Sequence, residues 1–195
     1  MIVTRVTPLA NGPADSNERI TPMFRLTTLA LALSTAMISS AFAGDQYVDK
    51  TGFAASGFDV VSYFDLDQSK VGETQTAPTP GKAGITADYN GAKFAFATEA
   101  HRDAFAANPA KYAPQYDGHC AYGVAKGGKV PGNPTLWRIV DGKLYLNITK
   151  NVVGFWEEDI PGNLSKSESN WTNLEAQAAS TEIIPNYSSP APVKN

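Results

Sequence analysis

Cys120 is the residue whose side chain is most suited to chemistry, because it is the single cysteine of a chain of 195 residues. It follows Gly118 and His119 within residues 116–128, and we expect the second half of this stretch to form a short helix entered through the turn at Gly118. Backbone N–H groups at a helix start stabilise a thiolate, and a neighbouring imidazole either lowers the thiol pKa or shares a metal ion with the sulfur. The alternative is that Cys120 is a small buried apolar residue.

The small number of cysteine and histidine side chains limits the kinds of metal site that the chain can form. With one cysteine and two histidines, a single copy cannot form a closed Cys₄ or Cys₂His₂ zinc site. The best set within one chain is Cys120 with His119 or His101, completed by a carboxylate such as Asp59 or Asp117. This set predicts an open site or a soft ion at low coordination, copper first and zinc second, and a site shared across a homodimer is also possible.

The remaining candidate side chains have structural interpretations as well. His101 stands four residues before Phe105 on one face of an expected helix, which favours a half-buried structural histidine over a ligand. Asp59 and Tyr63 belong to a β-prone run, where hydrogen bonding within the fold explains them.

Thiol redox chemistry is the alternative function for the same cysteine. Cys120 would then be an attacking or oxidisable thiolate, tuned by His119 and Tyr122. The absence of a second, resolving cysteine counts against this interpretation.

Several function classes have no support in the sequence. It contains no phosphate-binding glycine loop, no Gly-x-Ser-x-Gly, no His-Glu-x-x-His and no Cys-x-x-Cys, so we expect no nucleotide or organic cofactor, and a binding role is favoured over an enzyme. The formal net charge is −3 and the lysines are dispersed, which argues against a nucleic-acid partner.

The first 43 residues predict export. Residues 23–43 have a short cationic start, an apolar run and a final Ala-Phe-Ala, the pattern of a signal peptide cleaved after Ala43. The apolar run is too short to span a membrane, so we expect a periplasmic or secreted protein without stable membrane insertion after processing. Residues 1–22 are polar and form a poor leader, so we interpret them as a mis-assigned extension that precedes a true start at Met23.

The rest of the chain predicts a small α+β domain, in which two hairpins and short helices pack around the central cysteine turn. Asn90-Gly91 within 86–96 and Asp141-Gly142 within 137–146 are the dipeptides that tight hairpins require. Helices are expected over 99–107, 109–112, the residues after Cys120, 149–159 and a last short stretch with Trp171 and Leu174. Val60–Phe64 is predicted as a strand, 44–56 as a polar segment, 57–174 as the domain and 175–195 as a disordered tail.

Several segments together resemble the exported YHS-domain proteins, some of which are selenoproteins. They are Gly57-Phe58-Asp59-Val60-Val61-Ser62-Tyr63-Phe64, the Tyr89-Asn90-Gly91 hairpin, His101-Arg102-Asp103-Ala104-Phe105, Pro109 to Tyr116, Gly118-His119-Cys120-Ala121-Tyr122, Val140 to Asn147, and Asp159-Ile160-Pro161-Gly162 with Trp171.

The resemblance implies a functional role for the position of Cys120, because thiolate chemistry or soft-metal binding suits a position that selenocysteine can take. Related YHS domains occur in copper-transporting ATPases and often carry two cysteines suspected of binding metal. His119 stands where that family has an aromatic residue, and His101 where it has Asn, so any role of either histidine is particular to this chain.

The sequence therefore predicts an exported YHS-like module that binds copper through Cys120, with His119 as second ligand and Asp59 or Asp117 as outer partner. The alternatives are a thiol redox enzyme or sensor and a non-catalytic interaction module. The expected partners are a second copy of the chain or a periplasmic redox or metal-carrying protein.

Overall fold

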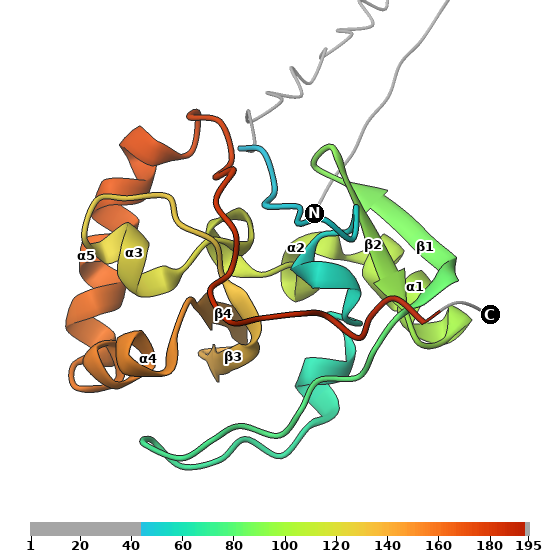
Figure 1. Ribbon diagram of the computed structural model, residues 1–195, viewed down its shortest axis with the longest axis horizontal. Coiled ribbons are helices and arrows are strands. Elements are labelled where there is room, and N and C mark those ends of the chain that lie inside the picture. Colours follow the sequence, from blue (N-terminus) through green and yellow to red (C-terminus); the bar gives the residue numbers. More distant parts are fainter. Residues whose placement is uncertain (1–43, 194–195) are drawn as a thin grey trace, which may run out of the picture. The chain divides into compact units, whose positions relative to one another are not determined.

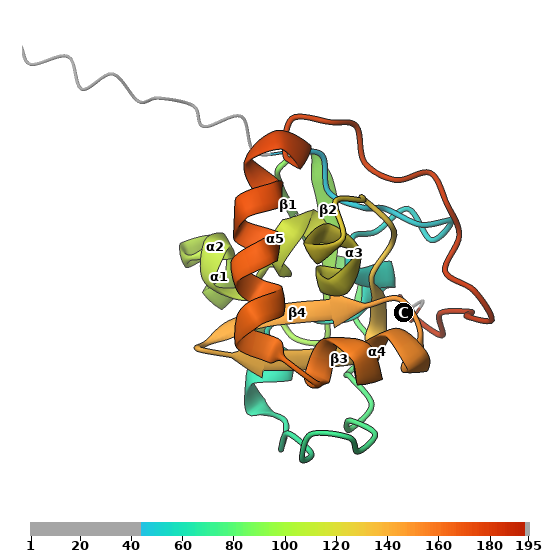
Figure 2. The same ribbon diagram turned by 90° about the vertical axis from the view of Figure 1, so that its left-hand side faces the viewer.

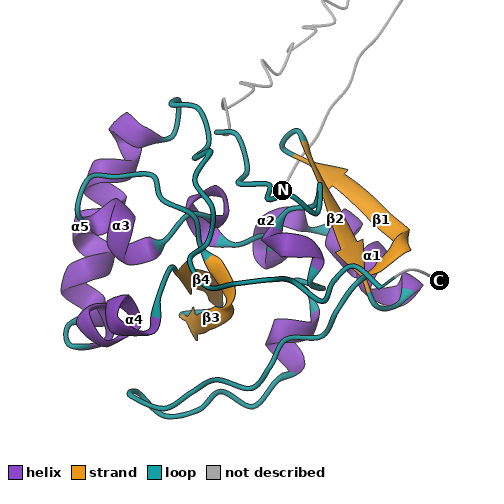
Figure 3. Cartoon of the chain, viewed as in Figure 1, coloured by secondary structure: helices purple, strands orange, loops and turns teal. Residues whose placement is uncertain are grey.

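Two antiparallel hairpins and five α-helices form the domain (Figures 1 and 3), in a computed structural model that describes residues 44–193. The predicted leader and the N-terminal extension lie outside the described residues. The chain divides into two units, and all described residues belong to the second, Ser39–Asn195. The predicted α+β class and both predicted hairpins are confirmed.

The two hairpins turn as the sequence predicts. The first pairs β1 (Lys82–Tyr89) with β2 (Ala92–Phe96), and the second pairs β3 (Asn133–Val140) with β4 (Lys143–Asn147). In the first turn Asn90 has a φ of 47° and Gly91 one of 73°, and Asp141-Gly142 repeats this conformation with 49° and 73°. Two consecutive positive φ values match the twist of the flanking strands, which explains the Asn-Gly and Asp-Gly pairs.

Four of the five α-helices in the described residues begin at a side chain that caps them. The five are α1 (Glu99–Ala107), α2 (Pro109–Tyr112), α3 (Ala121–Ala125), α4 (Lys150–Glu157) and α5 (Ile160–Leu174), and α2 is the exception. Thr98 caps α1 by accepting the N–H of His101, and Thr149 caps α4 in the same way. The last helix is longer than predicted, because Pro161 lies in its first turn, where a missing N–H costs nothing, instead of only ending the helix before it.

The predicted strand at Val60–Phe64 is wrong, because residues Ser62–Asp65 form a turn of 3₁₀ helix. The cause is Asp59, whose carboxylate accepts the backbone N–H groups of Val61 and Ser62. These local side-chain hydrogen bonds offer the backbone an alternative to a sheet ladder.

Two hydrophobic clusters hold the elements together. Figure 1 shows β1, β2 and α1 at one end of the domain and α3, α4 and α5 at the other, with β3, β4 and α2 between them, and Figure 2 shows α5 lengthwise. The first cluster centres on Phe94, Phe96 and Phe105, whose rings are in contact. The second joins β4, α3, α4 and α5 through Tyr145, Val124, Trp156 and Leu174.

Residues 175–193 lie against the domain, where the sequence predicts a disordered tail. Ile184 and Ala191 are buried, and Val193 forms a parallel bridge with Lys82 of β1. The buried side chains of Ile184 and Ala191 and the backbone pairing of Val193 stabilise this segment, although its composition is that of a loop. No helix within residues 44–193 is long and apolar enough to cross a membrane.

One buried ion pair connects β3, α4 and the loop before β1. The side chains of Arg138 and Glu157 are 6% and 4% exposed, with Nη2 of Arg138 2.5 Å from Oε1 of Glu157. Arg138 also donates to the carbonyl groups of Ser69 and Lys70, and Glu157 accepts the N–H of Gly72. The pair therefore anchors the loop as well as the sheet.

Replacing Arg138 with Met should lower the free energy of unfolding by about 3–5 kcal/mol, because Glu157 would remain as a buried charge without its partner. Denaturant unfolding measures the change. The control is Lys93→Met, which removes the exposed pair between Lys93 and Asp88 and should cost less than about 1 kcal/mol. Equal effects of the two substitutions would contradict the burial argument.

Candidate functional site

Cys120 is fully buried and begins α3 as its capping residue. Its sulfur accepts the N–H of Gly123 at 3.3 Å, and its S–H donates to Oδ1 of Asn147 at 3.4 Å. The same Asn147 oxygen accepts the N–H of Tyr122 at 3.1 Å. The helix start predicted from the sequence is confirmed, and the thiol is one of the groups that complete it.

Burial raises the pKa of the Cys120 thiol above its ordinary value. Backbone N–H groups of Gly123, Ile148 and Tyr122 act in the opposite direction, as the helix-start argument expects, but their effect is smaller. The resting form in the folded domain is therefore the neutral thiol.

His119 is also fully buried, and both of its ring nitrogens are occupied. Nδ1 donates to the carbonyl of Tyr116 at 2.8 Å, and Nε2 accepts the N–H of Ser180 at 3.1 Å, partners that assign the proton to Nδ1. Burial lowers the pKa of His119 to about 4, with a further lowering from Lys129. His119 is thus a neutral histidine that connects the turn before α3 to the C-terminal segment.

The structure does not bring together the predicted metal ligands Cys120, His119, Asp59 and Asp117. His119 and Cys120 are consecutive residues of extended backbone, with ψ angles of 161° and 121°, so their side chains point to opposite sides. Oδ1 of Asp117 accepts from Gln46, and burial raises the pKa of Asp117 to about 6. Within residues 44–193, no three His, Cys, Asp or Glu side chains gather in a group that could hold a metal ion.

Two of the predicted site residues, Asp59 and His101, do meet. Oδ2 of Asp59 lies 2.7 Å from Nδ1 of His101 and accepts the N–H of Ala97 at 2.8 Å. Its other oxygen accepts from Val61 and Ser62. Because the side chain of Asp59 is fully buried and held by backbone groups on both oxygens, it fixes the orientation of the imidazole.

The other nitrogen of this imidazole faces partly toward solvent. The His101 side chain is 27% exposed, and its Nε2 lies 3.8 Å from Oδ2 of Asp65, an exposed residue. With Nδ1 carrying the proton that Asp59 accepts, Nε2 presents a lone pair that can bind a metal ion. The sequence does not point to Asp65, because the β propensity of Val60–Phe64 conceals the 3₁₀ turn that directs Asp65 toward His101.

Tyr63 and Tyr122 serve the fold. The hydroxyl of Tyr63 donates to the carbonyl of Pro134 at 2.8 Å, and burial raises the pKa of Tyr63 well above its ordinary value. The ring of Tyr122 packs against Phe155, with the two ring centroids 6.1 Å apart.

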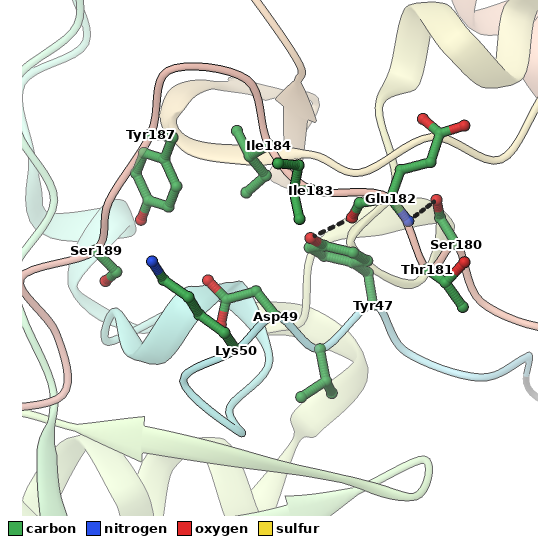
Figure 4. Close-up of a pocket in the computed structure, with 11 residues that line it drawn as sticks. Tyr47, Asp49, Lys50, Ser180, Thr181, Glu182, Ile183, Ile184, Tyr187 and Ser189 are labelled. Atoms are coloured by element: carbon green, nitrogen blue, oxygen red, sulfur yellow. Dashed lines mark hydrogen bonds between the residues drawn. The ribbon is translucent and has the colours of Figure 1, made fainter.

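A pocket of about 190 Å³ opens between residues 47–50 and 180–189. Figure 4 shows the amine of Lys50 and the hydroxyl of Tyr187 directed toward the same space, with Ile183 and Ile184 beside it. The pocket is smaller than the roughly 300 Å³ at which organic ligand sites begin. Neither His101 nor Cys120 lines it.

Comparison of the chain with protein-family models, with curated proteins and with solved structures finds no match. The resemblance to exported YHS-domain proteins thus stays a prediction from the sequence.

The Cys120 thiol should be inert in the folded domain. At pH 8 we expect a disulfide reagent to modify it at least about 100-fold more slowly than in the protein unfolded in urea, because the sulfur is covered and its pKa is raised. The release of the chromophore from the reagent measures both rates. A folded rate close to the unfolded rate would show that the cover over the sulfur opens readily.

The neutral, buried His119 should make the protein sensitive to acid. Its pKa is about 4 in the folded state and 6.5 ordinarily, so between these values the unfolded chain binds more protons. His119 therefore leaves the free energy of unfolding undiminished above pH 6.5. As the pH falls toward 4, protonation of the unfolded chain lowers this free energy by about 2–3 kcal/mol. Urea unfolding from pH 7 to 4.5 should show a shallower decline for His119→Gln than for wild type, and equal slopes would contradict this assignment.

Proposed function

We propose that this domain binds a metal ion through Nε2 of His101, with the carboxylate of Asp65 as a second ligand. The observation that supports it is the hydrogen bond between Asp59 and Nδ1 of His101. Histidines that bind metal ions almost always donate their other ring N–H to a carboxylate or carbonyl, which sets the tautomer and raises the basicity of the coordinating nitrogen. Here that arrangement is built on a fully buried carboxylate.

The ligand types favour Cu(II), followed by Zn(II). Imidazole suits both ions, and Cu(II) is the tighter binder in the usual order of divalent metals. Two protein ligands leave positions for water, for a small anion or for a residue of a second copy of the chain. The proposal keeps the metal-binding function predicted from the sequence and moves it from Cys120 and His119 to His101 and Asp65.

The geometry at Cys120 gives less support to a metal ion there. The sulfur is fully buried, it already has hydrogen-bond partners, and both nitrogens of the adjacent His119 are occupied. Binding of copper at this position would first require the start of α3 to open and His119 to give up the N–H of Ser180.

Thiol chemistry at Cys120 is a second candidate, favoured by the backbone N–H groups of Tyr122, Gly123 and Ile148 around the sulfur. Such donors stabilise a sulfur anion once it forms. The resemblance to a family with selenoprotein members points in the same direction. This function needs access to the sulfur, so it depends on the reactivity measurement described above.

Native mass spectrometry with Cu(II) and Zn(II) tests the metal-binding proposal. The informative variant is His101→Asn, because an Asn amide can still donate to Asp59 while the coordinating nitrogen is lost. We expect it to weaken Cu(II) binding at least about 10-fold, and Asp65→Asn to weaken it by about as much. Cys120→Ser is the matched control and should bind Cu(II) as wild type does.

The contrary outcomes are distinct. Metal retained by His101→Asn and lost by Cys120→Ser would place the ion at the cysteine. Wild-type protein that binds neither ion would remove the metal-binding function and leave thiol chemistry or a non-catalytic interaction role.

A further inference from the structure

Gly44 lies buried against Asp117 and Glu175, and it is the residue that follows the predicted cleavage position at Ala43. A Cβ atom on Gly44 would stand 2.5 Å from Oδ2 of Asp117 and also against the backbone oxygen of Glu175. This separation is too short for carbon and oxygen. Only a residue without a side chain therefore fits here.

The same position suits a nitrogen atom. Hydrogen bonds from N–H to oxygen span about 2.7–3.2 Å, so a shift of a few tenths of an ångström would turn both oxygens into acceptors. In glycine, a rotation of about 120° around the Cα–C bond moves the nitrogen to the place that a Cβ would occupy. A nitrogen still bonded to Ala43 has to bring the preceding chain along, whereas a terminal ammonium is free to turn.

One of the two receiving groups, Oδ2 of Asp117, has no hydrogen-bonded cation in the described chain, whereas the carbonyl of Glu175 already accepts from Lys129. Oδ2 of Asp117 is buried without a hydrogen-bond partner, while Oδ1 is held by Gln46 at 2.6 Å. Lys129, the nearby lysine, directs its Nζ to the carbonyl groups of Glu175 and Gln177. A buried carboxylate oxygen without a partner is costly, and its most effective complement is a charged donor.

The backbone also holds Asp117 in place for this contact. Asp117 has a φ of 52°, in the left-handed region, and its carbonyl accepts the N–H of Tyr47 at 2.8 Å. Burial is the main cause of the raised pKa of Asp117, the charge of Lys129 offsets part of the rise, and Glu175 and Asp45 add to it.

We propose that cleavage after Ala43 releases a Gly44 α-ammonium that binds Oδ2 of Asp117 and the carbonyl oxygen of Glu175. The site takes a primary ammonium group, and its ligand is the new terminus of the chain itself. Processing would then complete the fold by joining the N-terminal segment to the end of α5. The proposal rests on the predicted cleavage position and is independent of the metal site.

Two chains that differ only at the start test the contact: one begins at Gly44, the other at Phe42, and both contain all described residues. We expect the chain that begins at Gly44 to melt about 3–6 °C higher at pH 7, and Asp117→Asn to abolish the difference. Equal melting temperatures, or a difference that persists in Asp117→Asn, would overturn the proposal.

A second measurement covers the case in which Asp117→Asn fails to fold. The α-amine of the Gly44 chain should be acylated at least about fivefold more slowly in the folded protein than in urea, because an ammonium in an ion pair gives up its proton less readily. Equal rates would overturn the contact. N-terminal sequencing of the chain exported from a bacterial host tests the cleavage separately, and a first residue other than Gly44 would remove the basis of the proposal.

Discussion

The buried carboxylate of Asp59 is the interaction on which the described domain depends most. A fully buried charge is tolerated only when hydrogen bonds replace the lost water, and Asp59 receives backbone N–H groups of Val61, Ser62 and Ala97 together with Nδ1 of His101. These donors come from the turn after Asp59 and from the junction between β2 and α1. Satisfying one charge therefore joins two segments of the chain and orients the imidazole in the same step.

In the turn around Cys120, hydrogen bonds within the fold occupy side-chain atoms that could otherwise bind a metal ion. His119 and Cys120 are neighbours in sequence, and such a pair is a natural candidate for shared metal binding. Their extended backbone sends the two side chains to opposite sides, where each completes a different structural connection. His119 links the turn to Ser180, and Cys120 caps α3, so hydrogen bonding within the fold occupies the atoms that a metal ion would need.

Local signals in the sequence predicted what depends on a few adjacent residues. The turn dipeptides Asn90-Gly91 and Asp141-Gly142 need positive φ angles, and this requirement is confined to the turn itself. The α+β class followed from these elements. The β propensity of Val60–Phe64 predicts a strand, but the hydrogen bonds from the backbone to Asp59 stabilise a 3₁₀ turn instead. Propensity alone does not include such side-chain hydrogen bonds.

The sequence by itself thus determined the hairpins, the approximate positions of the helices and most of the residues able to do chemistry, although not Asp65. Only the tertiary structure decided which of those residues share a site. The hydrogen bond between Asp59 and His101 spans 42 positions, the contact of His119 with Ser180 spans 61, and burial raises the pKa of the Cys120 thiol. Such pairings depend on how distant segments pack and exclude water, and no short-range pattern of residues records that packing.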